Sequence, residues 1–355
     1  MPLDCTPYTL DCPPSALDPP GRSLKMAAKR YCTSESAADA AGLTLLFAHC
    51  IGAHKEQWEP TIAGMFALQN RAGTPRHQRV REAWAFDWQN HGDSAVLNRE
   101  LLLGAGREDG VSAFEWAGAI AAFVRSPRMQ GQRIVAIGHS AGAGTMVVST
   151  QHMPTPPYAA LVLIEPSLAA PPLFHAHVAP TLPAIVAATT LRRASWASRA
   201  EAHAWLAPRA PWRGWDARVL QAFVDYGLHE TSDGDAGVAL KCAPQQEAVA
   251  YPDVQPHFAA VRALPRIGAQ VHVVWASRSE WCAFCRVGVH RPQIIQNALA
   301  DAVPGRTFAS VTRVEGGHML VQEQPDRMAR AICDVLDSVD VGLDGQAQGR
   351  VRSRL

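Results

Sequence analysis

The chain has 355 residues, a formal net charge of +1 at pH 7 and 48% hydrophobic residues. This length allows one large domain with an insertion, or two domains. The near-neutral charge gives no reason to expect binding to nucleic acid or to an acidic membrane surface. No apolar stretch reaches the length that spans a bilayer. We therefore predict a globular protein with no transmembrane segment and no nucleic-acid partner.

The predicted elements alternate between short apolar strands and helices. Residues 1–23 are rich in proline and lack a periodic apolar pattern, so we expect an irregular N-terminal segment. Strands are expected at 24–31, 43–48, 83–86, 133–137, 160–164, 271–275 and 310–314. Helices are expected at 114–124, 143–151 and 323–339. This alternation predicts an α/β fold in which a parallel sheet is covered by helices on both faces.

Between residues 167 and 265 the alternation stops, and the sequence becomes rich in alanine, arginine and tryptophan. An insertion of this kind lies over the carboxyl ends of the strands, where ligands bind. We predict a helical cap over 167–265, with the α/β core formed by 24–166 and 266–339. Four tryptophans lie close together in the cap, and we expect them to attach it to the sheet. They are Trp196, Trp205, Trp212 and Trp215.

The motif Gly138-His139-Ser140-Ala141-Gly142 directly follows the apolar run 133–137 and precedes a helix of small residues. A strand, a sharp turn and a helix are what a nucleophile elbow requires. Glycine on each side gives the turn room, because a Cβ there would collide with the neighbouring strand or helix. We predict that Ser140 is a catalytic nucleophile; the alternative is an ordinary serine in a strand–helix turn.

A serine hydroxyl needs a base to take its proton, and the base needs an orienting carboxylate. His318 follows the last predicted strand and two glycines, so we predict that it is the base. Two acids fit the chain order of nucleophile, acid and base. Glu165 directly ends the strand 160–164, where a carboxylate is poorly solvated and needs a partner. Glu280, several residues after the strand 271–275, is the alternative acid.

The oxyanion that forms during acyl transfer requires two N–H donors. One is expected to be the amide of Ala141, next to the nucleophile. The other is expected in the loop after the strand 43–48, where Ile51 is the preferred donor and Cys50 the alternative. We expect His49 to shape this loop rather than to act as a base.

Metal and cofactor chemistry is not expected. The eight cysteines are scattered, which suits a reducing compartment better than a disulfide framework. Cys282 and Cys285 form a close pair with His290 nearby, but a zinc site would need a second pair at matching spacing. We interpret the pair as ordinary packed side chains and predict neither a metal ion nor an organic cofactor.

Five motifs add a resemblance to this interpretation. They are His49-x-x-Gly52-x-His54-Lys55-Glu56-x-Trp58, Asn90-His91-Gly92-Asp93-Ser94, Ile164-Glu165-Pro166, Ser277-Arg278-Ser279-x-Trp281-Cys282 and Gly316-Gly317-His318. Over residues 24–338 the chain resembles the α/β-hydrolase superfamily, and within it a fungal peroxisomal branch. The resemblance implies a mostly parallel sheet flanked by helices, a helical cap after the sixth strand, and an acid after that strand, which favours Glu165. Cys50 departs from the many members that carry glycine there.

The resemblance also implies an enzyme. We expect a serine hydrolase that cleaves carboxylic esters or acyl thioesters through an acyl-enzyme on Ser140, in lipid or secondary metabolism. The alternatives are an acyltransferase, a lyase, or a non-catalytic binding scaffold. If the substrate is an acyl-CoA rather than a simple acyl ester, guanidinium groups of the cap could bind its phosphates. The candidates are Arg192, Arg193, Arg199, Arg209, Arg213 and Arg218, which otherwise simply face solvent.

The sequence finishes with a stretch rich in glycine and glutamine and then with Ser353-Arg354-Leu355. This tripeptide is similar to the Ser-Lys-Leu signal that the peroxisomal import receptor reads at a free C-terminus. We predict that 340–355 form a flexible tail that presents this signal. The expected location is the peroxisomal matrix, with the import receptor as a partner; the cytoplasm is the alternative.

Overall fold

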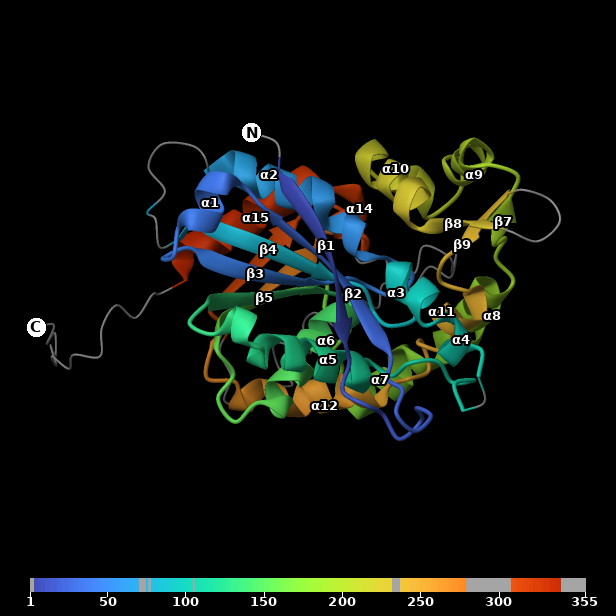
Figure 1. Ribbon diagram of the computed structural model, residues 1–355, viewed down its shortest axis with the longest axis horizontal. Coiled ribbons are helices and arrows are strands. Elements are labelled where there is room, and N and C mark those ends of the chain that lie inside the picture. Colours follow the sequence, from blue (N-terminus) through green and yellow to red (C-terminus); the bar gives the residue numbers. More distant parts are fainter. Residues whose placement is uncertain are drawn as a thin grey trace, which may run out of the picture.

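The computed structural model describes residues 3–69, 75, 78–104, 106–231, 237–278 and 308–339. A central sheet lies between two layers of helices, and further elements gather at one end (Figure 1). The strands of the central sheet are β1 (Asp4–Asp11), β2 (Lys25–Cys32), β3 (Leu43–Ala48), β4 (Val80–Phe86), β5 (Arg133–His139), β6 (Tyr158–Ile164), β10 (Gln270–Ala276) and β11 (Ser310–Val314). The main helices outside the cap are α1 (Ser34–Ala38), α2 (Glu59–Gln69), α3 (Gly92–Leu97), α4 (Arg99–Leu102), α5 (Ala113–Arg125), α6 (Ala141–Ser149), α12 (Gln255–Ala263), α14 (Leu320–Glu323) and α15 (Pro325–Ser338).

The strands of this sheet lie in the order β1-β2-β4-β3-β5-β6-β10-β11. β2 is antiparallel to both of its neighbours, and the pairs from β4 to β11 are parallel. The predicted mostly parallel sheet is thus confirmed. Because parallel strands end at the same edge of a sheet, the loops after β3, β5, β6 and β11 meet at one edge.

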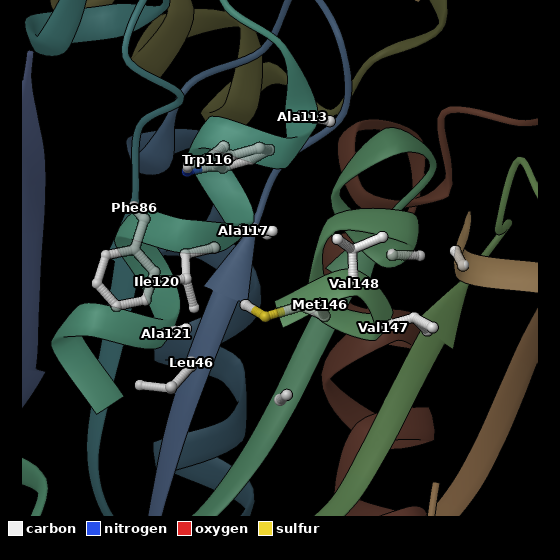
Figure 2. Packing of buried hydrophobic residues seen from close by; sticks show 14 of the residues in the cluster. Leu46, Phe86, Ala113, Trp116, Ala117, Ile120, Ala121, Met146, Val147 and Val148 are labelled. Atoms are coloured by element: carbon white, nitrogen blue, oxygen red, sulfur yellow. The ribbon is translucent and has the colours of Figure 1, made fainter. Parts of the chain in front are cut away.

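Side chains of the strands enter two separate cores. On one face, Leu46 of β3 packs with Trp116 of α5 and Met146 of α6 (Figure 2). On the other face, Phe47 of the same strand packs in a cluster with residues of α2 and α15. β3 is therefore buried on both sides, which explains why its sequence is continuously apolar rather than alternating.

The prediction of an irregular segment over 1–23 is wrong for residues 4–11, which form the edge strand β1. This strand pairs antiparallel with β2 along its whole length, from Asp4 opposite Cys32 to Asp11 opposite Lys25. The strand predicted at 24–31 is therefore the second of the sheet. Most side chains of β1 are exposed, and only Tyr8 and Leu10 pack against the core, so the segment carries little apolar pattern.

The cap differs from the helical prediction in two ways. Its helices are α7 (Pro171–His177), α8 (Leu182–Thr190), α9 (Arg199–Leu206), α10 (Ala217–Tyr226) and α11 (Pro244–Ala248). It also contains an antiparallel sheet in the order β7 (Ser195–Trp196), β9 (Gly237–Leu240) and β8 (Leu228–Thr231). The predicted boundary at 265 lies too late, because Ala260 of α12 is buried in the main core with residues of α6.

The cap tryptophans stabilise the cap itself rather than attach it to the sheet. Trp196 and Trp212 are buried in a cluster with Phe223 and other residues of the cap, and Trp205 and Trp215 pack against that cluster. Adjacent ring centroids lie 5.7 Å apart for Trp196 and Trp205, and 6.1 Å apart for Trp205 and Trp212. The cap therefore has its own hydrophobic core. Across the described ranges, no helix is long and apolar enough to cross a membrane.

Candidate active site

Ser140 occupies the sharp turn between β5 and α6, as predicted for the nucleophile. Its backbone has φ 55° and ψ −116°, a conformation that costs free energy in any residue with a side chain. The N–H of Ser140 donates to the carbonyl of Ile164 on β6 at 2.9 Å, which holds the turn in place. Among the described residues, Ser140 and Glu165 are the only non-glycine residues with positive φ.

The two glycines of the motif are required by close backbone contacts. A Cβ at Gly138 would lie 2.4 Å from the carbonyl oxygen of Gly142. A Cβ at Gly142 would lie 2.4 Å from the carbonyl oxygen of Ala48, at the end of β3. Any larger residue at either position would push α6 away from the sheet and displace Ser140.

His318 lies in the loop after β11, and its Nε2 is 3.0 Å from Ser140 Oγ. The loop is held in two places. The Nε2 of His139, next to the nucleophile, is 2.8 Å from the carbonyl oxygen of His318 and donates to it. The N–H of Gly317 donates to Glu323 at 2.8 Å. The structure thus brings the predicted base to the predicted nucleophile, although the two are far apart in sequence.

Glu165 is the acid that the structure places beside the base. Its Oε2 lies 3.0 Å from His318 Nδ1, and its Oε1 accepts from the N–H of Ala276 at 2.5 Å. The side chain is 4% exposed, so both carboxylate oxygens are engaged inside the protein. This geometry holds the imidazole in one orientation, with Nε2 toward the serine. Glu280, the alternative, lies outside the described residues.

The predicted oxyanion donors line the same cavity as Ser140. Ala141, Ile51 and Cys50 all border this cavity. Within the described ranges, neither the N–H of Ile51 nor that of Ala141 has an acceptor in the protein. Two backbone donors at the nucleophile are thus available to a developing negative charge.

The rest of the cavity is formed largely by the cap, and its wall is mostly apolar. The segment from α7 to α8 contributes Phe174, Val178, Leu182 and Ile185. A later part of the cap contributes Trp212, Trp215 and Phe223. Such a wall suits the hydrocarbon part of an acyl group, because burial of apolar surface stabilises its binding.

Ser167 and Glu247 are polar residues of the cavity wall that were not predicted for the site. Ser167 Oγ lies 2.9 Å from Ser140 Oγ. Its place, two residues after Glu165, is the signal that could have identified it. Arg192 and Glu247 form a bidentate pair at 3.0 and 2.5 Å in the cavity wall. They are 55 residues apart, and nothing in the sequence indicates their pairing.

The cap arginines considered for CoA phosphates are mostly engaged within the protein, which argues against a preformed phosphate site. The engaged arginines are Arg192 with Glu247, Arg193 with Glu201, Arg199 with Glu230, Arg218 with Asp216 and Asp326, and Arg209 over the ring of Trp205. Across the described residues there is also no group of three or more His, Cys, Asp or Glu side chains placed to hold a metal ion. Cys282, Cys285 and His290 lie outside these residues.

Several buried histidines make the fold sensitive to acid. Burial lowers the pKa of His49 and of His139 to about 3, and that of His257 to about 4. In the unfolded chain a histidine titrates near pH 6.5. Between these pH values the unfolded state binds more protons than the folded state. The contribution of these histidines to stability is therefore complete above about pH 6.5 and falls as the pH decreases.

We therefore expect the free energy of unfolding to decrease between pH 7.5 and 5.5, by about 1 kcal/mol for each such histidine. Urea denaturation at a series of pH values measures this slope. The slope is set by the difference in bound protons between the unfolded and folded states, and in His257→Leu this difference should be smaller by about one proton. An unfolding free energy that stays constant from pH 7.5 to 5.5 would contradict the prediction.

The comparisons with known proteins agree with this architecture. A sequence profile described as Alpha/beta hydrolase family matches residues 45–331. No curated protein matches the sequence. The peroxisomal alpha-beta-hydrolase Lpx1 from Saccharomyces cerevisiae superposes with a TM-score of 0.71 at 18% identity, over 99% of this chain and 93% of that chain. A thioesterase domain from the curacin biosynthetic pathway superposes with a TM-score of 0.61 at 13% identity, over 94% of this chain and 99% of that chain. A thermophilic esterase from Thermogutta terrifontis superposes with a TM-score of 0.57 at 15% identity, over 94% of this chain and 99% of that chain.

Proposed function

This chain belongs to the alpha/beta hydrolase family, and from that membership we propose that it is a serine hydrolase of carboxylic esters or acyl thioesters. The observation that carries the proposal is the continuous hydrogen-bonded series from Ser140 Oγ to His318 and from His318 to Glu165, with both distances at 3.0 Å. An activated serine beside two unengaged backbone donors is an arrangement made for acyl transfer.

In the proposed reaction, Ser140 Oγ attacks the acyl carbon while His318 Nε2 takes its proton. The oxyanion that forms is stabilised by the N–H groups of Ala141 and Ile51. As the bond to the leaving alcohol or thiol breaks, His318 returns the proton to it. A water molecule, deprotonated by His318, then attacks the acyl-enzyme and releases the carboxylic acid. Glu165 stabilises the imidazolium form in both halves.

A fluorophosphonate probe tests this proposal, because it labels a serine only where the hydroxyl is activated. We expect the probe to modify the wild-type protein at Ser140, as identified by peptide mass spectrometry. Ser140→Ala is the matched control and should remain unlabelled. A wild-type protein that stays unmodified would support the alternative of a non-catalytic binding scaffold.

For the substrate, we propose an acyl group of largely hydrocarbon character. What supports this is the apolar cap wall formed by residues such as Phe174, Val178 and Trp212. Both esters and thioesters remain within the proposal, because the same oxyanion forms from either. The carboxylate partners of Arg192 and Arg193 reduce the net positive charge available to a phosphate, which favours a simple ester over an acyl-CoA.

We also propose that the protein acts in the peroxisomal matrix, as a member of a fungal peroxisomal branch of the family. Ser353, Arg354 and Leu355, which lie outside the described residues, would be bound by the import receptor. The fold similarity to a peroxisomal hydrolase supports this location.

Deletion of these three residues is expected to change the distribution of a tagged protein from punctate to diffuse, because the receptor has no signal to bind. Fluorescence microscopy with a peroxisomal marker measures the change, and turnover of the purified variant should equal that of the wild type. Puncta that persist after the deletion would assign the location to another signal.

A further inference from the structure

The loop after β3, residues 49–52, carries the predicted oxyanion donor Ile51, and two buried histidines bind the peptides on either side of that residue. We propose that His49 and His91 are positioning residues, which orient this loop so that the Ile51 N–H points at the oxyanion. The inference rests on the proposed serine hydrolase function and deepens it. Neither histidine borders the cavity that contains Ser140, so both act through the backbone.

His49 holds the peptide that joins Cys50 to Ile51. Its Nε2 accepts from the N–H of Trp88 at 3.1 Å, so this nitrogen carries no proton. The proton of the neutral ring is then on Nδ1, which donates to the carbonyl of Cys50 at 2.7 Å. The ring is 1% exposed, and its burial excludes the charged form at neutral pH.

The consequence for Ile51 follows from peptide geometry. In a planar trans peptide, the C=O of one residue and the N–H of the next point in opposite directions. The carbonyl of Cys50 and the N–H of Ile51 belong to the same peptide. A hydrogen bond that fixes this carbonyl therefore fixes the N–H on the opposite side, and the available donor is held in one direction.

His91 holds the next peptide, between Ile51 and Gly52. The N–H of Gly52 donates to His91 Nε2 at 3.1 Å, and His91 Nδ1 donates to the side-chain oxygen of Asn90 at 2.8 Å. The ring is fully buried and stacks on Trp88 with an interplanar angle of 13°. Both histidines thus have the Nδ1–H tautomer, and together they fix both peptide planes beside Ile51.

The chain after β3 and the chain after β4 are joined at further points, so the two histidines are rigidly supported. Lys55 donates from its backbone N–H to Asp87 at 2.8 Å, and its ammonium group also binds Asp87 at 2.8 Å. On the cap side, Asn90 donates to the carbonyl of Gln246 at 3.1 Å. The segment after β4 therefore supports the loop that carries the donor.

The test separates geometry from stability with paired substitutions. Asn can place a donor where His49 has Nδ1, and Gln can place an acceptor where His91 has Nε2; Leu provides neither. We expect His49→Leu and His91→Leu to lower kcat for an aryl ester about 10- to 100-fold and to change KM less than about threefold. The reason is that the oxyanion is absent from the bound substrate and develops only in the transition state. His49→Asn and His91→Gln should recover most of kcat. His152→Leu, in the turn that follows α6, is the control for loss of a histidine.

A boronic acid gives a second readout, because its tetrahedral adduct with Ser140 resembles the transition state. Its Ki should rise in parallel with the fall in kcat/KM for the Leu variants, whereas the Ki of a carboxylic acid product should not change. Leu variants that are folded and keep the wild-type kcat would overturn the inference. So would a His91→Gln variant no more active than His91→Leu.

The tautomers can be measured on the wild-type protein without any variant. In 15N NMR spectra at pH 7, we expect His49 and His91 to carry the proton on Nδ1 and none on Nε2. The opposite tautomer at either ring would overturn the inference even if the enzyme is active. A protein with these tautomers that hydrolyses no ester and is not labelled by fluorophosphonate would instead refute the proposed function.

Discussion

Replacement of Ser140 by alanine is expected to lower the kcat for an aryl ester about 10⁴- to 10⁶-fold, because no other atom can form the acyl-enzyme. Residual activity would come from the cavity and the oxyanion donors acting on water. Steady-state hydrolysis of a chromogenic ester measures the loss. Alanine adopts the strained turn at about the same cost as serine, so the thermal unfolding midpoint should stay near that of the wild type.

Ser167→Ala is the informative comparison for this prediction. Its hydroxyl lies 2.9 Å from that of Ser140, so a second serine is within reach of the same reaction. If Ser140 is the nucleophile, Ser167→Ala should retain kcat within about tenfold. A large loss in Ser167→Ala combined with an active Ser140→Ala would reassign the nucleophile to Ser167.

Replacement of Glu165 by glutamine is expected to lower kcat about 10⁴-fold while the fold remains intact. Glutamine has nearly the same shape as glutamate but cannot stabilise the imidazolium form of His318. Its amide group can also face Nδ1 and select the wrong tautomer of the ring. The kcat and KM of the purified variant, compared with the wild type, measure the effect.

Glu280→Gln is the matched variant for the other acid that the sequence allows. We expect its kcat to stay close to that of the wild type, because Glu165 already binds His318 at 3.0 Å. If Glu280→Gln loses more activity than Glu165→Gln, then Glu280 is the acid of the triad and Glu165 supports the fold.

Much of the site could be predicted because its parts have strong local signals. The elbow at Ser140 joins an apolar strand, two glycines and a helix of small residues within a short segment. Glu165 and His318 each follow a β-strand, and parallel strands end at the same edge of a sheet. Chain order and strand position were therefore enough to bring Ser140 and His318 together and to reduce the acid to Glu165 or Glu280.

The parts that could not be predicted depend on contacts without a local pattern. β1 is an edge strand with mostly exposed side chains, and alternation of apolar and polar residues is confined to its last four positions. The pair formed by Arg192 and Glu247 joins two distant segments of the cap. The strands β8 and β9 are only four residues long, and a short strand inside a helical region gives a weak periodic signal.

The separate hydrophobic core of the cap has a consequence for how this protein can evolve. Ser140, His318, Glu165 and the oxyanion donors all lie on the sheet side, whereas Phe174 and Trp212 of the cavity wall lie in the insertion. The hydrophobic cluster of the cap is distinct from the two clusters of the sheet, and substitutions at distant positions without shared partners have nearly additive effects on stability. A lineage can thus acquire a preference for a new acyl chain through changes in the insertion while it inherits the reaction unchanged.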